Sequence, residues 1–276
     1  MVVDFHVHST ASDGTCTPSE LAEKARGFAA IALTDHDNCD GLDGWNGVAG
    51  IELSIEPGKG FDKFHLLGLG IDPKDIRLKK FLANILAGRN DRNVRIRANF
   101  RRLGIEMADV ETYAHGEVLA RPHFARWLVD HGYAADIKES FAKYLLPDSP
   151  VATRCYEERW HPPQEEAFRA IHEAGGICVM AHPKYWRNDW KTTGLDYAAA
   201  EHELAALKER GLDGVEALYQ ANTNEENIAF TRIATKLGYL KTAGSDFHGS
   251  NKPTIPLGME VSEDFIAPVL ERLDMV

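Results

Sequence analysis

The stretch DFHVHSTASDG (4–14) places two histidines, His6 and His8, one residue apart at the end of a run of β-forming residues. Side chains at positions i and i+2 of a strand leave from the same face of the strand. We therefore expect His6 and His8 to be neighbours at the end of a first strand, followed by a loop that carries Asp13. Two neutral imidazoles at this spacing suit a metal chelate, although two structural histidines fit a single such pair equally well.

The bulk composition limits the possible classes of protein. The chain has 276 residues, of which 44% are hydrophobic, so a packed globular core is expected. A formal net charge of −11 argues against a long nucleic acid as partner. Because no apolar run is long enough to cross a bilayer, and because the first strand already carries His6, we expect neither a membrane partner nor a signal peptide. The scattered cysteines indicate a cytoplasmic protein, and the sequence indicates no oligomeric state.

Strands and helices alternate along most of the chain, which is typical of an α/β barrel. A helix is expected after the first loop, with Thr17 as N-cap and Pro18 at its first position. From about residue 72 to residue 153 the sequence is instead helical in period and rich in arginine. We therefore predict an α/β barrel domain formed by residues 1–71 and 154–276, capped at its active site by a helical insertion of residues 72–153.

Histidines and carboxylates recur at the ends of the predicted strands. The set comprises His6, His8, Asp13, His36, Glu52, His65, His182, Asp246 and His248. Active sites of parallel α/β barrels lie at the C-terminal ends of the strands, and buried histidines and carboxylates are costly unless they are paired or ligating. The set therefore favours two or three divalent ions such as Mn, Fe or Zn, with Glu52 as the natural bridge. Acid–base chemistry without metal is the alternative.

Six segments, in order, carry a resemblance to a known family: DFHVHSTASDG, TDHD, GIELS, FHLLGLG, AHP and GSDFH. They resemble the motifs of the PHP family (polymerase and histidinol phosphatase) over essentially the whole chain. The insertion, with GRNDRNVRI and RPHFARWLV, resembles the branch of stand-alone phosphoesterases. That branch includes nucleoside 3′,5′-bisphosphate phosphatases and 5′-to-3′ exonucleases of short RNA. The resemblance implies a distorted (β/α)7 barrel.

The resemblance also implies how the ligands divide among three ions. The first ion would be bound by His6, His8, Glu52 and Asp246. The second would be bound by Asp13, His36 and His248, and the third would share Glu52 and add His65 and His182. Of these residues, Asp13 and Asp246 are also expected to take part in catalysis.

Phosphate-binding residues are expected in the insertion. The resemblance implies Arg89, Asn90 and Arg92 of RNDR, and Arg121 and His123 of RPH. Arg89 and Arg92 share one side of a helix and are expected to bind a second phosphate. We expect Arg95, Arg97, Arg101 and Arg102 to face mainly solvent. His123 is the candidate general acid, with a helix-capping histidine as the alternative.

Two features depart from the pattern of the family. Only NCDGLDGWNGVA (38–49) separates TDHD from the strand of Glu52, where this branch usually has a further helix and strand. In AHPKYW, Lys184 replaces the usual glycine, either as a surface lysine or as an extra phosphate contact.

The expected activity is hydrolysis of phosphate esters by attack of a hydroxide that bridges two metal ions. The expected substrates are small nucleotides, either a nucleoside 3′,5′-bisphosphate or a short 5′-phosphorylated oligonucleotide. A cyclic sugar-phosphate phosphodiesterase and a histidinol-phosphate phosphatase are the alternatives within the same chemistry. An amidohydrolase-type C–N hydrolase and a non-catalytic metal-binding module are less favoured.

Overall fold

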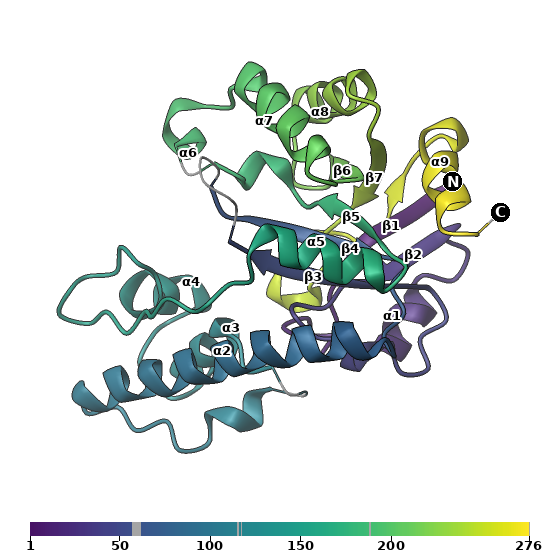
Figure 1. Cartoon of the computed structure of the whole chain (residues 1–276). Helices are drawn as coiled ribbons and strands as arrows, with labels where there is room; N and C mark the ends of the chain where they lie inside the picture. Colours follow the sequence, from purple (N-terminus) through teal and green to yellow (C-terminus); the bar gives the residue numbers. More distant parts are fainter. Residues whose placement is uncertain (57–61, 115, 117, 188, 276) are drawn as a thin grey trace.

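The computed structural model describes residues 1–56, 62–114, 116, 118–187 and 189–275. Its centre is one mixed sheet with the strand order β7-β6-β5-β4-β3-β2-β1-β8. Helices surround this sheet, and a helical layer extends from one side of it (Figure 1). The strands are β1 (Val2–Val7), β2 (Ala30–Leu33), β3 (Val48–Ile55), β4 (Phe64–Leu69), β5 (Ile177–Met180), β6 (Gly214–Tyr219), β7 (Leu240–Gly244) and β8 (Met259–Glu260).

The sheet closes on itself between β7 and β1. The amide of Asp246 donates to the carbonyl of His6 (2.8 Å), and the amide of His8 donates to the carbonyl of Phe247 (3.0 Å). Val7 and Phe247 form a parallel bridge at the same place. The short β8 pairs antiparallel with β1 beside this closure. The predicted distorted α/β barrel is thus confirmed.

β3 and β4 form an antiparallel pair, so the sheet is mixed rather than wholly parallel. Ser54 lies opposite His65, and Glu52 lies opposite Leu67. The start of β4 therefore meets the C-terminal end of β3. This pairing is how His65, near the beginning of its strand, comes to the same end of the barrel as the other predicted ligands.

Helices cover the outside of the barrel: α1 (Pro18–Lys24), α5 (Gln164–Glu173), α6 (Trp190–Thr193), α7 (Tyr197–Glu209), α8 (Asn224–Lys236) and α9 (Glu263–Arg272). The predicted start of α1 is confirmed, because Thr17 and Glu20 cap its first turn reciprocally and Pro18 opens it. Phe168 and Ile171 of α5 belong to the same buried cluster as Ile51 and Leu53 of β3.

A long helix joins the barrel to the helical layer. The layer contains α2 (Ile76–Arg102), α3 (Arg121–Asp130), α4 (Ile137–Ser140), the 3₁₀ turn η2 (Val110–Tyr113) and the π-helical turn η3 (Phe141–Leu145). Leu78 and Ile85 of α2 pack in the core of the barrel, whereas Ile96 and Phe100 belong to a separate cluster formed within residues 96–155. The middle of α2, which carries Arg89 and Arg92, therefore lies where the layer meets the barrel.

The connection between β2 and β3 is unusually short. These neighbouring strands are parallel, and parallel strands normally need a helical crossover. Here the described connection contains only the 3₁₀ turn η1 (Asp40–Leu42). Among the described residues, no helix is long and apolar enough to span a membrane.

Candidate metal centre and substrate cavity

Strand ends bring the nine predicted ligands to one place. His6 lies on β1 and His8 directly follows this strand, and their ring centroids are 5.2 Å apart. The ring of His8 also stacks on that of His248, which follows β7, with centroids 4.1 Å apart. Both His6 and His8 are fully buried. Buried imidazoles in contact with one another require a shared partner to offset the cost of removing them from water.

Glu52 of β3 is that shared partner. Its carboxylate oxygens lie 3.3 Å from His6 Nε2, 3.1 Å from His8 Nε2, 3.0 Å from His36 Nδ1, 2.8 Å from His65 Nδ1 and 3.1 Å from His182 Nε2. The side chain of Glu52 is 1% exposed. A single buried carboxylate thus faces histidines from four different parts of the barrel rim.

Several buried ligand atoms fit a metal centre because they lie close to one another without forming regular hydrogen bonds. In the described part of the chain, His6 Nε2, His8 Nε2, Asp13 Oδ1, His36 Nδ1 and Glu52 Oε2 have no hydrogen-bond partner. Buried polar atoms are normally paired, so this convergence of orphaned nitrogens and oxygens needs an explanation. Imidazole and carboxylate together are a suitable donor set for divalent Mn, Fe or Zn. The residues present therefore fit the expected metal ions.

Eight of the nine predicted ligands fall into three overlapping groups that could each hold an ion: His6, His8, Glu52 and Asp246; His8, Asp13, His36 and His248; and His36, Glu52 and His65. The ninth, His182, is in none of these groups, although its Nε2 lies 3.1 Å from Glu52. The first group is the set expected for the first ion. His8 joins the second group, and His36 lies near the third as well as the second. The division of ligands among ions stays a prediction.

The electrostatics of the cluster keep its carboxylates ionised. Burial raises the pKa of Glu52, but His36, His6 and His65 outweigh burial and hold this pKa well below its usual value. Burial lowers the pKa of His8, yet the neighbouring carboxylates of Asp246 and Glu52 raise it to about 9. Protons on the imidazoles and divalent ions therefore compete for the same nitrogens.

A second layer of carboxylates orients the ligands. Glu216 of β6 lies 3.0 Å from His6 Nδ1 and also accepts the amide of His182 (2.5 Å). Asp35 accepts hydrogen bonds from the amide and hydroxyl of Ser9 and from the hydroxyl of Ser12. Glu216 thereby fixes the ring orientation and tautomer of His6, whereas Asp35 holds the loop after β1 through Ser9 and Ser12.

Asp246 presents its two oxygens to different neighbours. Its Oδ1 lies 3.4 Å from His8 Nε2 and 3.3 Å from His248 Nδ1. Its Oδ2 accepts the hydroxyl of Tyr219 (3.0 Å) and the ammonium group of Lys252 (2.6 Å). One oxygen is thereby held by hydrogen bonds while the other points into the ligand cluster.

Beside the cluster lies a basic cavity of about 450 Å³. Its lining includes the predicted ligands Asp13, His36 and His65 and the basic residues Lys63, Arg89, Arg92, Arg121 and Arg159, together with Glu158 and uncharged residues. Arg92 is 4% exposed and is held by the side chain of Asn93 and the carbonyl of Leu119. Among the described residues, neither Arg92 nor Arg121 pairs with a carboxylate. Such arginines suit an anionic ligand.

Asp37 fixes two of these arginines in place. Its Oδ2 accepts hydrogen bonds from Arg89 Nε (2.8 Å) and from Arg159 Nη2 (2.7 Å). Burial raises the pKa of Asp37, but Arg159 and Arg89 outweigh burial and hold this pKa well below its usual range. Asp37 belongs to the barrel, whereas Arg89 belongs to α2 and Arg159 to the segment that returns from the helical layer. The ion pair therefore ties the layer to the barrel.

Three predicted substrate residues do not line this cavity, and their roles in binding stay predictions. Asn90 is exposed and lines a different hollow, because it lies one position along α2 from the buried Arg89. Lys184 binds Glu226 (2.7 Å) and the carbonyl of Ala221. His123 accepts the amide of Ala120 through Nδ1 (3.0 Å), and so acts as the capping histidine of α3. It lines a neighbouring hollow rather than the basic cavity.

The sequence interpretation missed several residues of the site. Asp37 stands in the TDHD motif, so its position next to a predicted ligand was a usable signal. Arg159 gives no such signal, because it lies outside the regular helices and strands. The contact of Glu216 with the predicted ligands could not be predicted without knowing that β6 lies next to β5. Arg95 and Arg97 are half-buried in ion pairs with Asp91 and Glu111, whereas Arg101 and Arg102 are exposed as predicted.

Comparisons with known proteins agree with this architecture. The model of the PHP domain matches residues 4–85. A 3′,5′-nucleoside bisphosphate phosphatase of Chromobacterium violaceum is 33% identical over 260 residues, covering 89% of this chain and 87% of that protein. A 5′-3′ exoribonuclease of Haemophilus influenzae is 30% identical over 259 residues, covering 89% of each chain.

A solved structure resembles the whole fold. An amidohydrolase from Chromobacterium violaceum, with bound sulfate and no metal, superposes with a TM-score of 0.82 at 29% sequence identity. The superposition covers 99% of this chain and 95% of that chain. The chain therefore belongs to the PHP family of metal-dependent phosphoesterases.

Proposed function

We propose that the chain hydrolyses phosphate esters of small nucleotides, and that a nucleoside 3′,5′-bisphosphate is the substrate that the site fits best. The observation that carries this proposal is the shared cavity, in which predicted metal ligands lie next to a cluster of buried arginines. A bisphosphate has one phosphate for each of these two regions. A short 5′-phosphorylated oligonucleotide offers the same pair of groups, and the two relatives act on substrates of these kinds.

We further propose that two or three divalent ions, Mn, Fe or Zn, bind to the nine ligand residues. When bound, such ions supply a nucleophile by lowering the pKa of water and neutralise charge on the phosphoryl group. Glu52 holds the imidazoles in one orientation. Arg92 and Arg121 bind and orient the second phosphate. Arg89 and Arg159, fixed by Asp37, raise the positive potential of the cavity. The four free cysteines fit a cytoplasmic enzyme.

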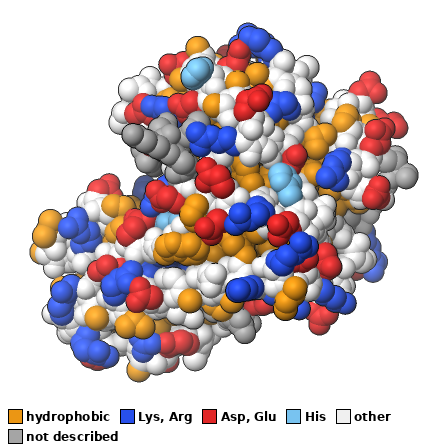
Figure 2. Space-filling model, viewed as in Figure 1, with side chains coloured by type: hydrophobic (Ala, Val, Ile, Leu, Met, Phe, Trp, Pro, Cys, Tyr) orange, Lys and Arg blue, Asp and Glu red, His pale blue; other side chains and the backbone are white. Residues whose placement is uncertain are grey.

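The charge distribution favours a small substrate. Figure 2 shows acidic and basic side chains interspersed over the viewed face of the molecule, without a continuous basic surface. Of the two described cavity arginines without a carboxylate partner, Arg92 is instead buried and Arg121 is half-buried. A strongly anionic molecule that fits within about 450 Å³ is thus attracted to the cavity rather than to the exterior.

The amidohydrolase-type alternative is less well supported. Enzymes of that type usually need a lysine at the end of a middle strand to bridge two metal ions. The corresponding place on β3 holds Glu52, whose carboxylate faces the histidines directly. A cyclic sugar phosphate stays a candidate because the short connection between β2 and β3 changes this side of the barrel.

The test is hydrolysis by the manganese-loaded protein of four compounds measured side by side. Inorganic phosphate is measured for adenosine 3′,5′-bisphosphate, AMP and histidinol phosphate, and the ring-opened phosphomonoester is measured for a ribose cyclic phosphate. We expect the highest kcat/KM for the bisphosphate. The variant Arg92→Ala should lose about tenfold or more of kcat/KM on the bisphosphate but much less on AMP, since it removes a charge-assisted contact to the second phosphate.

Arg101→Ala provides the matched control, because Arg101 lies on the same helix but is exposed and paired with Glu106. Arg101→Ala should leave kcat/KM unchanged on both the bisphosphate and AMP. Equal losses on both substrates in Arg92→Ala, or a preference for the cyclic phosphate in the wild type, would contradict the proposed substrate.

A further inference from the structure

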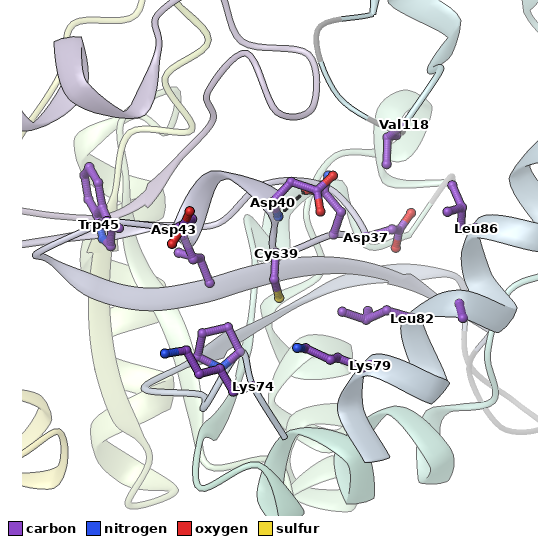
Figure 3. Close-up of a pocket in the computed structure, with 15 residues that line it drawn as sticks. Asp37, Cys39, Asp40, Asp43, Trp45, Lys74, Lys79, Leu82, Leu86 and Val118 are labelled. Atoms are coloured by element: carbon purple, nitrogen blue, oxygen red, sulfur yellow. Dashed lines mark hydrogen bonds between the residues drawn. The ribbon is translucent and has the colours of Figure 1, made fainter. Parts of the chain in front are cut away.

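The short connection between β2 and β3 leaves a hollow on the outside of the barrel. This hollow has a volume of about 790 Å³ and lies between residues 37–45 of the connection and α2. Figure 3 shows its lining, with Trp45 toward one end and Leu86 and Val118 toward the other. A helical crossover would normally cover this side of a parallel pair. The volume of the hollow falls in the range of small-molecule binding sites.

The hollow has an apolar body. Its apolar lining includes Leu42, Trp45, Pro73, Leu82, Ala83 and Leu86. The indole of Trp45 is fixed because its Nε1 donates to the carbonyl of Val48 (3.0 Å). Asn38 fixes the wall formed by the connection, since its side chain donates to the carbonyl of Ala11 and accepts the amide of Asp40. The site is thus preformed rather than a gap between mobile chains.

Charged groups face one another across this apolar body. Lys74 and Lys79 line the wall formed by α2 and the turn before it, whereas Asp40 and Asp43 line the opposite wall (Figure 3). None of these four side chains forms an ion pair with any residue that the structure describes. The thiol of Cys39 lies between the walls, within the electrostatic reach of both Asp40 and Lys79.

This pattern matches the chemistry of a nucleotide. A flat base can stack on an aromatic or apolar wall, and exocyclic amino groups donate to carboxylates. Phosphate is bound by lysine ammonium groups. We propose that the hollow is a second, non-catalytic binding site for a mononucleotide, with the base toward the Trp45 and aspartate side and the phosphate on Lys74 and Lys79.

The position of this site also links it to the catalytic cavity. Asp37 lines the hollow, and its carboxylate holds Arg89 and Arg159 of the cavity. Asp37 lies toward the end of the hollow that carries Leu86 and Val118 (Figure 3), so this end adjoins the two arginines that Asp37 fixes near the metal ligands. The proposal of this second site does not depend on the substrate assigned above, because no described residue lines both the hollow and the basic cavity.

The test is calorimetric titration of the chelator-treated wild-type protein with AMP, so that no turnover occurs. We expect two classes of site, one in the hollow and one in the arginine-lined cavity. The variant Lys74→Ala/Lys79→Ala should weaken one class by tenfold or more, and Arg92→Ala should weaken the other. Ala83→Trp, which fills the hollow from an exposed helix position, should abolish the first class. Lys80→Ala is the matched control, because Lys80 is an exposed lysine on α2 outside the hollow.

Alkylation of the cysteines gives a second, local readout. AMP should protect Cys39 from iodoacetamide at alkaline pH, as measured by mass spectrometry, while Cys16, which does not line the hollow, serves as the internal reference. Protection should disappear in Lys74→Ala/Lys79→Ala. Two results would overturn the proposal. One is a single class of AMP site that Arg92→Ala removes. The other is AMP binding and Cys39 protection that are unchanged in both Lys74→Ala/Lys79→Ala and Ala83→Trp.

Discussion

Glu52 illustrates how one residue can organise a whole site. Five histidine nitrogens lie within 3.3 Å of its carboxylate oxygens. The variant Glu52→Gln keeps the shape of the side chain but loses its negative charge, which attracts both metal ions and imidazolium groups. We expect the bound manganese per chain to fall to less than half and kcat to fall by about 100-fold or more. Metal analysis and phosphate release measure the two quantities.

The same substitution at an exposed glutamate controls for general effects. Glu260 lies on β8 and is exposed, so Glu260→Gln should keep both metal content and kcat. An unchanged metal content in Glu52→Gln would show that Glu52 is not part of the metal centre.

Asp37 gives a prediction about stability and pH. Because Arg159 and Arg89 hold its pKa below the value of 3.8 expected in the unfolded chain, its ionised form stabilises the folded state. This contribution is fully present above the unfolded pKa and is lost as the pH falls through the folded pKa. Asp37→Asn should lower the free energy of unfolding by about 3–5 kcal/mol at neutral pH.

Urea unfolding at several pH values tests the sign of this effect. The difference between wild type and Asp37→Asn should be the same at pH 7 and pH 5, and should narrow below about pH 4. A difference that grows as the solution is acidified would contradict the assignment of Asp37 as a carboxylate held ionised by arginines.

At the scale of elements, β6 acts on the metal centre without supplying a predicted ligand. Its Glu216 contacts Nδ1 of His6 on β1 and accepts the amide of His182 after β5. Glu216→Gln should therefore weaken manganese binding by about 10- to 100-fold, as removal of such supporting carboxylates generally does. Calorimetric titration of the chelator-treated protein measures this affinity. An unchanged affinity would mean that Glu216 serves the packing of β6 alone.

The elements also show what the sequence could and could not predict. The strand ends that carry His6, Glu52 and Asp246 were predictable, because alternation and turn residues define strands locally. The side of α2 that carries Arg89 and Arg92 was predictable from the helical period. The pairing of Arg159 with Asp37 was not predictable, because it joins residues 122 positions apart through a segment without regular structure.

The same limit explains why Asn90 and His123 do not line the basic cavity. Both residues stand inside motifs, and a motif does not say which side of a helix faces the cavity. Asn90 points away because one step along a helix turns the side chain by about 100°. His123 occupies the third position of α3, where its ring caps the start of the helix.

At the scale of the molecule, the charge of the chain and the charge of its site have opposite signs. The formal net charge is −11, yet arginines crowd the cavity. Burial lowers the pKa of Arg92 to about 8, and the neighbouring Arg89, Arg121 and Arg159 contribute to this shift. The folded protein therefore holds like charges together in the absence of an anion, and an anion that fills the cavity should relieve the repulsion.

Thermal unfolding tests this consequence. Inorganic phosphate should raise the Tm of the wild-type protein by several degrees relative to sodium chloride at equal ionic strength, because a ligand that binds only the folded state stabilises it. The variant Arg92→Ala/Arg121→Ala should show little of this increase. An equal increase in both proteins would place the anion elsewhere.

We propose that the orphaned nitrogens and oxygens around Glu52 form a metal centre at which phosphate esters are hydrolysed. The most direct measurement is phosphate release from adenosine 3′,5′-bisphosphate while manganese is titrated into chelator-treated protein. We expect no release without metal, and activity that rises with added manganese and reaches its plateau at two to three bound ions per chain. Full activity in the chelator-treated protein, or no activity at any manganese concentration, would contradict this proposal.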